Sequence, residues 1–161
     1  MMRIEPLDHH DLSVARKIHA VLLLAHAQEA RLLQVRSFEP MARSAEDIQA
    51  GVEFHLGALD ADVLLGALEV GPDNEPGQIS IVSLVVHPAH QRQGIARALV
   101  AEALRRSPGL ALCVTTGALN APALALYRGF GFVEYRRGTL GPEALEIVKL
   151  RRAPDAARIV S

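Results

Sequence analysis

The stretch ISIVSLVVHPAHQRQGIARALVAEAL, from Ile79 to Leu104, decides the fold, because an apolar strand gives way to a short polar loop that leads directly into a helix. The strand ends at His87 and Pro88. A helix is predicted over Gly94 to Arg106, since its apolar residues recur at helical spacing and can pack on a sheet. The segment therefore predicts a strand and a helix joined by a loop at the helix N-terminus.

This loop has the form Q-x-x-G-x-A, from Gln91 to Ala96. At the start of a helix several backbone N–H groups lack intrahelical partners, and the helix dipole directs its positive end outward. Gly94 and Ala96 allow the backbone to come close to a ligand. The loop predicts a phosphate site made mainly of main chain, although an ordinary strand-to-helix connection explains the hexapeptide alone equally well.

A second motif, NAPALALYRGFGF from Asn120 to Phe132, has the form N-x-x-A-x-x-L-Y-x-x-x-G-F. Asn120 is a good N-cap, and Pro122 suits a first turn in which its missing N–H costs little. Gly131 can end the helix in a left-handed conformation. The motif predicts a complete short helix.

The two motifs, in this order and separation, resemble the GNAT superfamily of acetyl-CoA-dependent N-acetyltransferases. The resemblance covers most of the chain, from the first strand to the last. It implies an α+β fold, an α/β sandwich with a mixed, mostly antiparallel central sheet of about seven strands, a splayed parallel pair and about four flanking helices. It also implies acetyl-CoA as co-substrate, bound where the two central parallel strands diverge.

The periodicity along the rest of the chain fits this architecture. A helix capped by Asp8 or Asp11 is predicted to run into the early thirties, and Ser44 with Asp47 predicts a capping box for a second, brief helix. Residues 35–40 are predicted to be a loop. Strands are predicted over Met2–Leu7, Val52–Leu59, Val63–Val70, Gln78–Val86, Leu110–Thr115, Phe132–Arg137 and Ala144–Leu150, the last two as a hairpin about Gly138 to Pro142.

Only the two strands that flank the Gly94 helix are predicted to be parallel neighbours. We expect a single GNAT-like domain over residues 1–150 and a loosely held tail over residues 151–161.

Composition narrows the function classes. At 161 residues with 50% apolar content, the chain can form one domain with a core, and a net charge of −1 argues against a general nucleic-acid binder. The single Cys113 excludes an internal disulfide and a multi-thiolate metal site. No signal peptide or membrane-spanning segment is read from the sequence, so a cytoplasmic location without a membrane partner is expected.

The resemblance assigns the cofactor-binding residues. The backbone of Leu84, Val85 and Val86 would hydrogen-bond the pantetheine amides, and Asn120 would meet the pantetheine while capping its helix. The pyrophosphate would lie over the loop, whose residues are Gln91, Arg92, Gln93, Gly94, Ile95, Ala96 and Arg97. A solvated helix face is the alternative for the two arginines.

Catalysis in this family is direct attack of an amine on the thioester, through an oxyanion that a strand N–H near Val85 can stabilise. Tyr127 matches the position whose hydroxyl protonates the leaving thiolate in many relatives. A core tyrosine packed beside Phe130 is the alternative.

The general base has no clear position. Cys113 stands where some relatives have a glutamate, and it is more simply a small core residue than a nucleophile. Glu69 and Ser83, on neighbouring strands, are the remaining candidates, acting through water. A solvent-facing strand residue is the favoured alternative for Glu69. His87 and His90 border the loop, where a phosphate contact competes with simple solvation.

No metal site is expected, because His9, His10, His19 and His26 lack a recognisable ligand spacing. Phe38, Glu39 and Arg43 are candidate acceptor-pocket residues from their location. The segment from Thr115 to Leu119 makes the connection before Asn120 longer than the tightest family pattern and is expected to shape that pocket.

Three functions stay open at this point. The leading one is an N-acetyltransferase acting on a primary amine of a small molecule, an amino acid or a peptide, in a ternary complex. The second is a non-catalytic acyl-CoA-binding sensor or regulatory module. A nucleotide-binding domain is third, because the loop lacks the G-K-[ST] and G-x-G-x-x-G patterns. The resemblance also allows a homodimer through the late strands.

Overall fold

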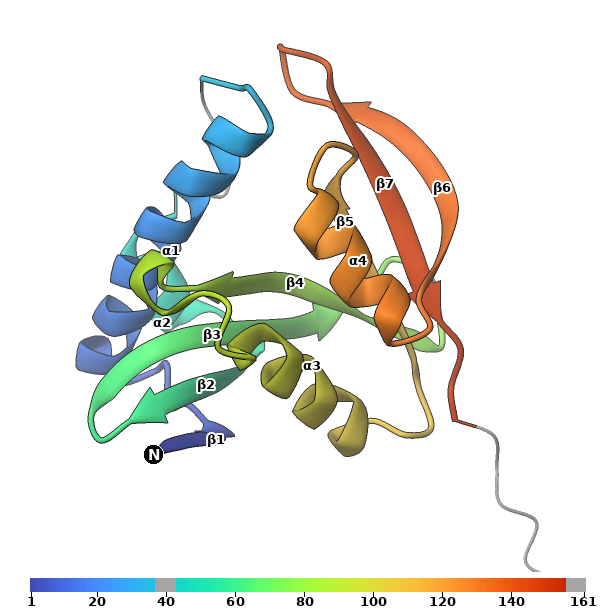
Figure 1. The fold of residues 1–161 in the computed structure, drawn as a ribbon. Coiled ribbons are helices and arrows are strands. Elements are labelled where there is room, and N and C mark those ends of the chain that lie inside the picture. Colours follow the sequence, from blue (N-terminus) through green and yellow to red (C-terminus); the bar gives the residue numbers. More distant parts are fainter. Residues whose placement is uncertain (37–42, 156–161) are drawn as a thin grey trace, which may run out of the picture.

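A computed structural model describes residues 1–36 and 43–155. Its centre is a seven-stranded sheet in the order β1-β2-β3-β4-β5-β7-β6 (Figure 1). The strands are β1 (Met2–Pro6), β2 (Phe54–Asp60), β3 (Val63–Pro72), β4 (Gln78–Val86), β5 (Ala111–Gly117), β6 (Val133–Leu140) and β7 (Leu145–Arg152). The helices are α1 (Leu12–Leu32), α2 (Ala45–Ala50), α3 (Ile95–Arg106) and α4 (Ala121–Gly129), with a short 3-10 turn, η2 (Pro88–His90), after β4.

The strand pairing confirms the predicted fold. Strands β1 to β4 form an antiparallel meander, β4 and β5 are parallel, and β7 lies between β5 and β6 and is antiparallel to both. The crossover between β4 and β5 is made by α3, as parallel neighbours require.

Several predicted boundaries were wrong. The last strand continues to Arg152, which pairs with Leu112, so it reaches two residues into the expected tail. Gly138 lies inside β6 opposite Ile147, and the turn comes later, where Gly141 adopts a φ of 75°. Thr116 and Gly117, expected in the connection after the predicted strand Leu110–Thr115, belong to β5, because β7 continues to pair with them.

Helices cover both faces of the sheet and divide the core in two. On one face α3 and α4 pack over residues such as Leu68 and Leu112. On the other face α1 and α2 pack over Ala67 and Val85. The alternation of side chains along β3 and β4 therefore supplies both layers, which is why the central strands are apolar along most of their length.

The parallel pair separates partway along. β4 pairs with β5 only from Gln78 to Ile81, opposite Ala111 to Val114. Beyond that point β4 is bonded only to β3 and β5 only to β7, and at the same level Val82 is an extra residue on β4 between the partners of Glu69 and Val70, which makes a bulge. Because a bulge bends the strand and increases its twist, the two halves of the sheet diverge here and leave an open edge on β4.

The capping residues act as the sequence predicts. Asp11 accepts a bond from the Ser13 N–H at the start of α1. Ser44 and Asp47 form the reciprocal capping box of α2. Asn120 Oδ1 accepts from the Ala123 N–H at 3.2 Å, which begins α4. Each bond satisfies a backbone donor that the helix itself cannot.

Candidate active site

The loop after β4 leaves backbone donors unpaired at the start of α3. Gly94 caps the helix in the left-handed conformation, with φ 78° and no side-chain cap, and Arg92 also has a positive φ of 62°. The first helical bond runs from Ala98 N to Gly94 O, so the N–H groups before it have no intrahelical acceptor. The loop in which the sequence predicts a phosphate site therefore presents unpaired backbone donors at a helix N-terminus.

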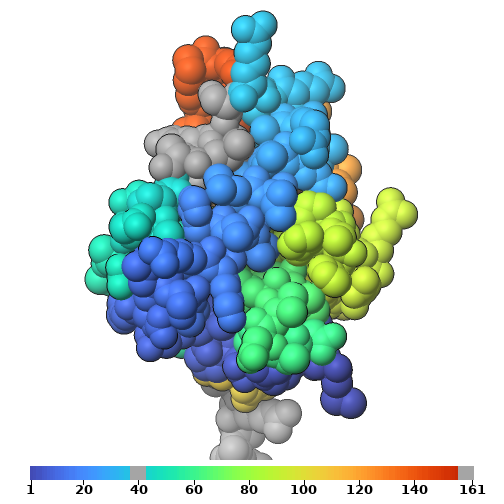
Figure 2. All heavy atoms as spheres, turned by 90° about the vertical axis from the view of Figure 1, so that its left-hand side faces the viewer, coloured from blue at the N-terminus to red at the C-terminus, as the bar shows by residue number. Residues whose placement is uncertain are grey.

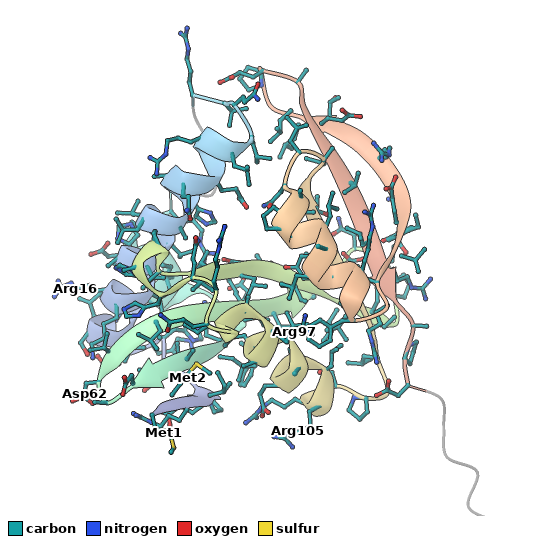
Figure 3. The ribbon with its side chains drawn as sticks, in the orientation of Figure 1. Met1, Met2, Arg16, Asp62, Arg97 and Arg105 are labelled. Carbon is teal, nitrogen blue, oxygen red and sulfur yellow. The ribbon has the colours of Figure 1, made fainter. Side chains whose placement is uncertain are left out.

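The side chains of the loop point in different directions. Arg92 and Gln93 are exposed. Arg97 lies between α3 and α4, with its guanidinium 5.7 Å from the Phe130 ring centroid (Figure 3). Gln91 instead exchanges amide hydrogen bonds with Gln28 of α1, one of them 3.1 Å long. This pairing holds the loop beside α1, where Figure 2 shows it in yellow-green against the blue helix.

The open edge of β4 belongs to Leu84 and Val86. His87 donates its N–H to Leu65 O on β3 at 2.8 Å. Because backbone groups alternate along a strand, Val85 also directs its N–H and C=O to β3, whereas Leu84 and Val86 direct theirs away. The sequence-based choice of Val85 as an exposed donor was wrong in register by one residue, while its neighbours have the geometry expected.

Tyr127 is buried, with 4% of its surface exposed. Its ring packs edge-to-face against Phe132, with centroids 5.4 Å apart, and Phe130 packs against the same core cluster, so the core position that the alternative interpretation predicts is present as well. Burial, together with the nearby Glu29 carboxylate, raises the pKa of Tyr127 above its ordinary value. The phenol therefore keeps its proton at neutral pH and has one to donate.

Glu29 is a candidate site residue that the sequence analysis missed. Asn120 Nδ2 donates a hydrogen bond to Glu29 Oε2 at 3.1 Å, and His26 Nδ1 lies 3.8 Å from Glu29 Oε1. Gly117 at the end of β5 permits the approach of α1, because a Cβ there would overlap the Leu33 side chain. The available sequence signal was the polar His26 and Glu29 in the otherwise apolar stripe of α1.

Glu69 is buried rather than solvent-facing, so the favoured alternative for it was wrong. Only 3% of its surface is exposed, and both its oxygens accept from Arg43, at 2.7 and 3.2 Å. Ser83 lies opposite Glu69 in the strand register and is half-buried. A carboxylate held in two bonds by a guanidinium is a weak candidate for accepting another proton.

His55 lies behind Glu69. It is 1% exposed, its Nε2 is 3.8 Å from Glu69 Oε2, and neither of its ring nitrogens has a hydrogen-bond partner within the described residues. Burial lowers the pKa of His55 to about 4, so the ring is neutral at neutral pH. The ring of its neighbour His9 lies with its centroid 4.4 Å away, tilted by 44°, and His9 Nε2 donates a hydrogen bond to the Gly51 carbonyl oxygen at 2.7 Å.

Cys113 is a fully buried free thiol, as the sequence predicts. Burial raises the pKa of this thiol, and the Asp73 carboxylate raises it further. Asp73 also pairs with Lys149 at 3.2 Å. The position that bears a glutamate in some relatives therefore holds an inert side chain here.

The sequence comparison decides the family. The acetyltransferase (GNAT) family matches residues 22–132, which include both motifs. The chain belongs to the GNAT family.

Individual relatives agree with this assignment. The UPF0157 protein YqkA of Bacillus subtilis (strain 168) is 31% identical over 130 residues, which are 80% of this chain but 37% of that protein, so the chain spans little more than a third of this relative. The ribosomal-protein-S18-alanine N-acetyltransferase of Escherichia coli has the same fold, with a TM-score of 0.74 and 18% identity over 99% of this chain and 97% of that one. The putative acetyltransferase yncA of Salmonella typhimurium, solved with acetyl-CoA, has a TM-score of 0.75 and 17% identity over 100% and 98% of the two chains.

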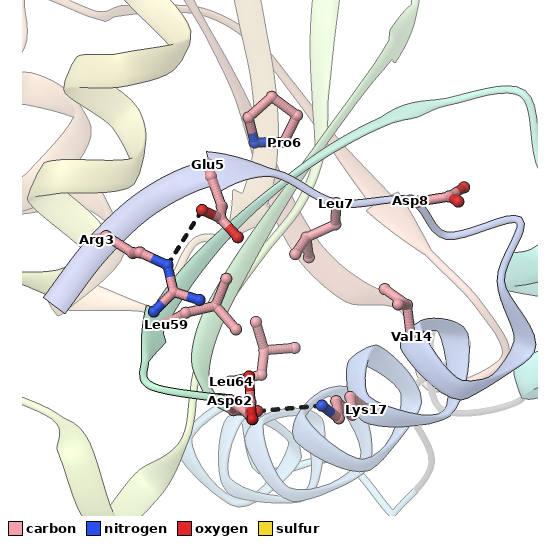
Figure 4. A pocket seen from close by; sticks show the side chains of 10 residues that line it. All are labelled: Arg3, Glu5, Pro6, Leu7, Asp8, Val14, Lys17, Leu59, Asp62 and Leu64. Carbon is pink, nitrogen blue, oxygen red and sulfur yellow. Dashed lines mark hydrogen bonds and ion pairs between the residues drawn. The ribbon is translucent and has the colours of Figure 1, made fainter.

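Two cavities of this GNAT domain lie away from the motif residues. One, of about 190 Å³, lies between β1 and the start of α1, where Arg3 bonds Glu5 and Lys17 bonds the Asp62 carbonyl (Figure 4). The other, of about 280 Å³, lies beside the end of α3. Neither is lined by Tyr127 or by the loop after β4.

The remaining candidates have varied positions. Phe38 and Glu39 lie outside the described residues. Within the described ranges, no group of three or more histidine, cysteine, aspartate or glutamate side chains is arranged for a metal ion. Across residues 1–36 and 43–155, no helix has the length and apolar content to cross a membrane.

Proposed function

We propose that this chain is an N-acetyltransferase that moves the acetyl group of acetyl-CoA to a primary amine of a small molecule, an amino acid or a peptide. The observation that carries the proposal is the opening between β4 and β5, which has the phosphate-binding loop after one strand and α4 with Tyr127 after the other. Membership of the GNAT family supports it. The amine would attack directly, with both substrates bound.

The loop is the proposed holder of the pyrophosphate. Backbone N–H groups of Gln93, Gly94 and Ala96 would make most of the contacts, because their direction is fixed by the chain and the helix dipole favours an anion. The exposed guanidinium of Arg92 and that of Arg97 would add charge-assisted bonds.

The pantetheine would follow the open edge of β4. Leu84 and Val86 present the backbone donors and acceptors that an extended chain of amides can pair with, as an added strand would. Asn120 donates one amide hydrogen to Glu29 and keeps a second, which is available to the pantetheine.

The chemistry needs one donor for the oxyanion and one for the thiolate. An N–H on the open edge of β4 is fixed in direction and costs no reorganisation, so it would stabilise the oxyanion as it forms. Tyr127 would donate its phenolic proton to the leaving sulfur, the role for which its protonated state suits it.

Release of free thiol from acetyl-CoA across a panel of amines, polyamines, amino acids and peptides tests the proposal. We expect release that depends on one class of amine, and calorimetry is expected to show saturable binding of coenzyme A. Binding without release for any amine would favour an acyl-CoA sensor instead. No binding of coenzyme A would remove both functions, and co-purification with ATP would revive the nucleotide-binding one.

Location and assembly are part of the same proposal. A buried free thiol at Cys113 suits the reducing cytoplasm. β6 is an edge strand of the sheet, so a homodimer through the late strands would have unpaired backbone groups available to it. Light scattering of the purified protein measures that assembly directly.

A further inference from the structure

Glu29 contacts the opposite side of the sheet through the opening. Helix α1 covers one face and α4 the other, yet the Glu29 carboxylate accepts a hydrogen bond from Asn120, 91 residues away, at 3.1 Å. This contact is geometrically available because β4 and β5 no longer pair at that level. Glu29 thus joins the two walls of the opening in which the thioester is proposed to lie.

The charge of Glu29 is not neutralised by a strong cation. Within the described residues, no arginine or lysine pairs with it, and the titratable groups recorded around it are His26 on its own helix and Tyr127 on α4. Its other polar neighbour, Asn120, is uncharged. Glu69 differs in this respect, because Arg43 already binds both its oxygens.

The position of Glu29 also allows contact with a substrate. Its side chain is 27% exposed, whereas that of Glu69 is 3% exposed. Asn120 occupies Oε2, and an ionised carboxylate has further acceptor positions on both oxygens. A positively charged donor can therefore reach Glu29 without breaking the contact between α1 and α4.

We propose that Glu29 binds the ammonium group of the acceptor and accepts its proton, which makes the acceptor a positively charged primary amine. The inference rests on the proposed function and replaces Glu69 and Ser83 as the proton acceptor. It needs no water relay, because the carboxylate borders the opening itself.

The reaction can proceed with Glu29 and Tyr127 as the groups that exchange protons with the substrates. The ammonium nitrogen gives one proton to Glu29, and its lone pair then forms the C–N bond to the thioester carbonyl carbon. The C–S bond breaks, and the sulfur takes the phenolic proton of Tyr127. The nitrogen loses a second proton as the amide forms, and this proton restores the phenol of Tyr127. The first proton then leaves Glu29 for water.

The two groups are coupled in a direction that assists the reaction. The negative charge of Glu29 disfavours ionisation of the Tyr127 phenol. Once Glu29 has taken the proton of the amine, that charge is gone, and Tyr127 becomes a better donor at the moment the thiolate needs one. Deprotonation of the acceptor and protonation of the leaving group are thereby linked through one carboxylate.

The test is Glu29→Gln, because glutamine keeps an oxygen for Asn120 and removes only the charge. We expect kcat/KM for the best amine of the panel to fall about 100-fold or more, and the shape of its pH profile to change. Affinity for coenzyme A is expected to stay unchanged. Glu46→Gln, an exposed glutamate on α2, is the matched control and should leave all three measurements unaltered.

A second measurement keeps this inference separate from the proposed function. Calorimetry with n-butylamine and n-butanol, in the presence of coenzyme A, compares a charged and an uncharged probe. We expect the wild type to prefer the amine and Glu29→Gln to lose the preference, even if no thiol is released. Equal binding of the two probes by the wild type, or an unchanged pH profile in the variant, overturns the role of Glu29; absent thiol release alone overturns the acetyltransferase.

Discussion

Two glutamates, Glu69 on the paired strand β3 and Glu29 on α1 beside the opening between β4 and β5, show how the surroundings decide what one side chain can do. Glu69 lies among β2, β3 and β4, where the strands are paired and Arg43 binds both carboxylate oxygens. Glu29 lies where β4 and β5 diverge, and the hydrogen-bond donor it meets is the uncharged Asn120. The continuous sheet turns a carboxylate into a structural ion pair, and the opening leaves one available for chemistry.

The largest effect is expected on stability, from removing the guanidinium of Arg43 that binds Glu69. Arg43→Ala leaves the Glu69 charge buried without its partner, which costs about 3–5 kcal/mol of stability. Urea unfolding at neutral pH measures the loss. The control is Arg105→Ala, which breaks an exposed pair with Glu102 and should change stability little. Equal losses in the two variants would show that Glu69 does not depend on Arg43.

Tyr127→Phe removes the proposed proton donor while keeping the packing of the ring against Phe132. We expect kcat for thiol release to fall about 10³-fold, which is about 4 kcal/mol in the barrier, because the thiolate must leave without a proton. Steady-state kinetics with the best amine, alongside calorimetry with coenzyme A, separate this step from binding. Retention of full turnover would return Tyr127 to a packing role.

The stability of the fold should also depend on pH, because of the buried His55. Burial lowers the pKa of His55 from 6.5 to about 4, so between these values the unfolded chain binds more protons than the folded one. Stability is then complete above about pH 6.5 and falls by up to about 3 kcal/mol as the pH drops toward 4.

Urea unfolding of the wild type and of His55→Leu, at several pH values in this window, measures that fall. The variant should lose most of the slope, whereas His19→Gln, a change on α1, should retain it. A wild-type stability that is flat from pH 6.5 to 4 would contradict a neutral buried His55.

The smallest effect is expected in the loop between β4 and α3. Gly94→Ala meets no atom within 4 Å, so its cost is the left-handed backbone alone, about 1 kcal/mol. We expect a several-fold weaker affinity for coenzyme A, measured by calorimetry. Gly109→Ala is the matched control, since that site is equally open and no positive φ is recorded there. Identical affinities in both variants would place the pyrophosphate elsewhere.

Much of the fold could be read from short stretches of sequence. The strand-to-helix junction at Gly94, the Asn120 cap and the Ser44–Asp47 capping box are each encoded within a few residues. Strand ends were less well predicted, because pairing with a neighbour extends β5 and β7 beyond their apolar patterns. The turn predicted about Gly138 to Pro142 contains Gly141, which adopts the positive φ, but it was predicted to begin too early, because β6 continues to pair with β7 as far as Leu140.

The candidate site divides along the same line. By itself, the sequence determined the loop before α3, the α4 helix and the place of Tyr127 on that helix, because local hydrogen bonding and helical periodicity operate over a few residues. Only the tertiary structure decided that Arg43 neutralises Glu69 and that Glu29 meets Asn120. Those pairs depend on the register of the strands and on where the sheet opens, and long-range packing of the whole chain sets both.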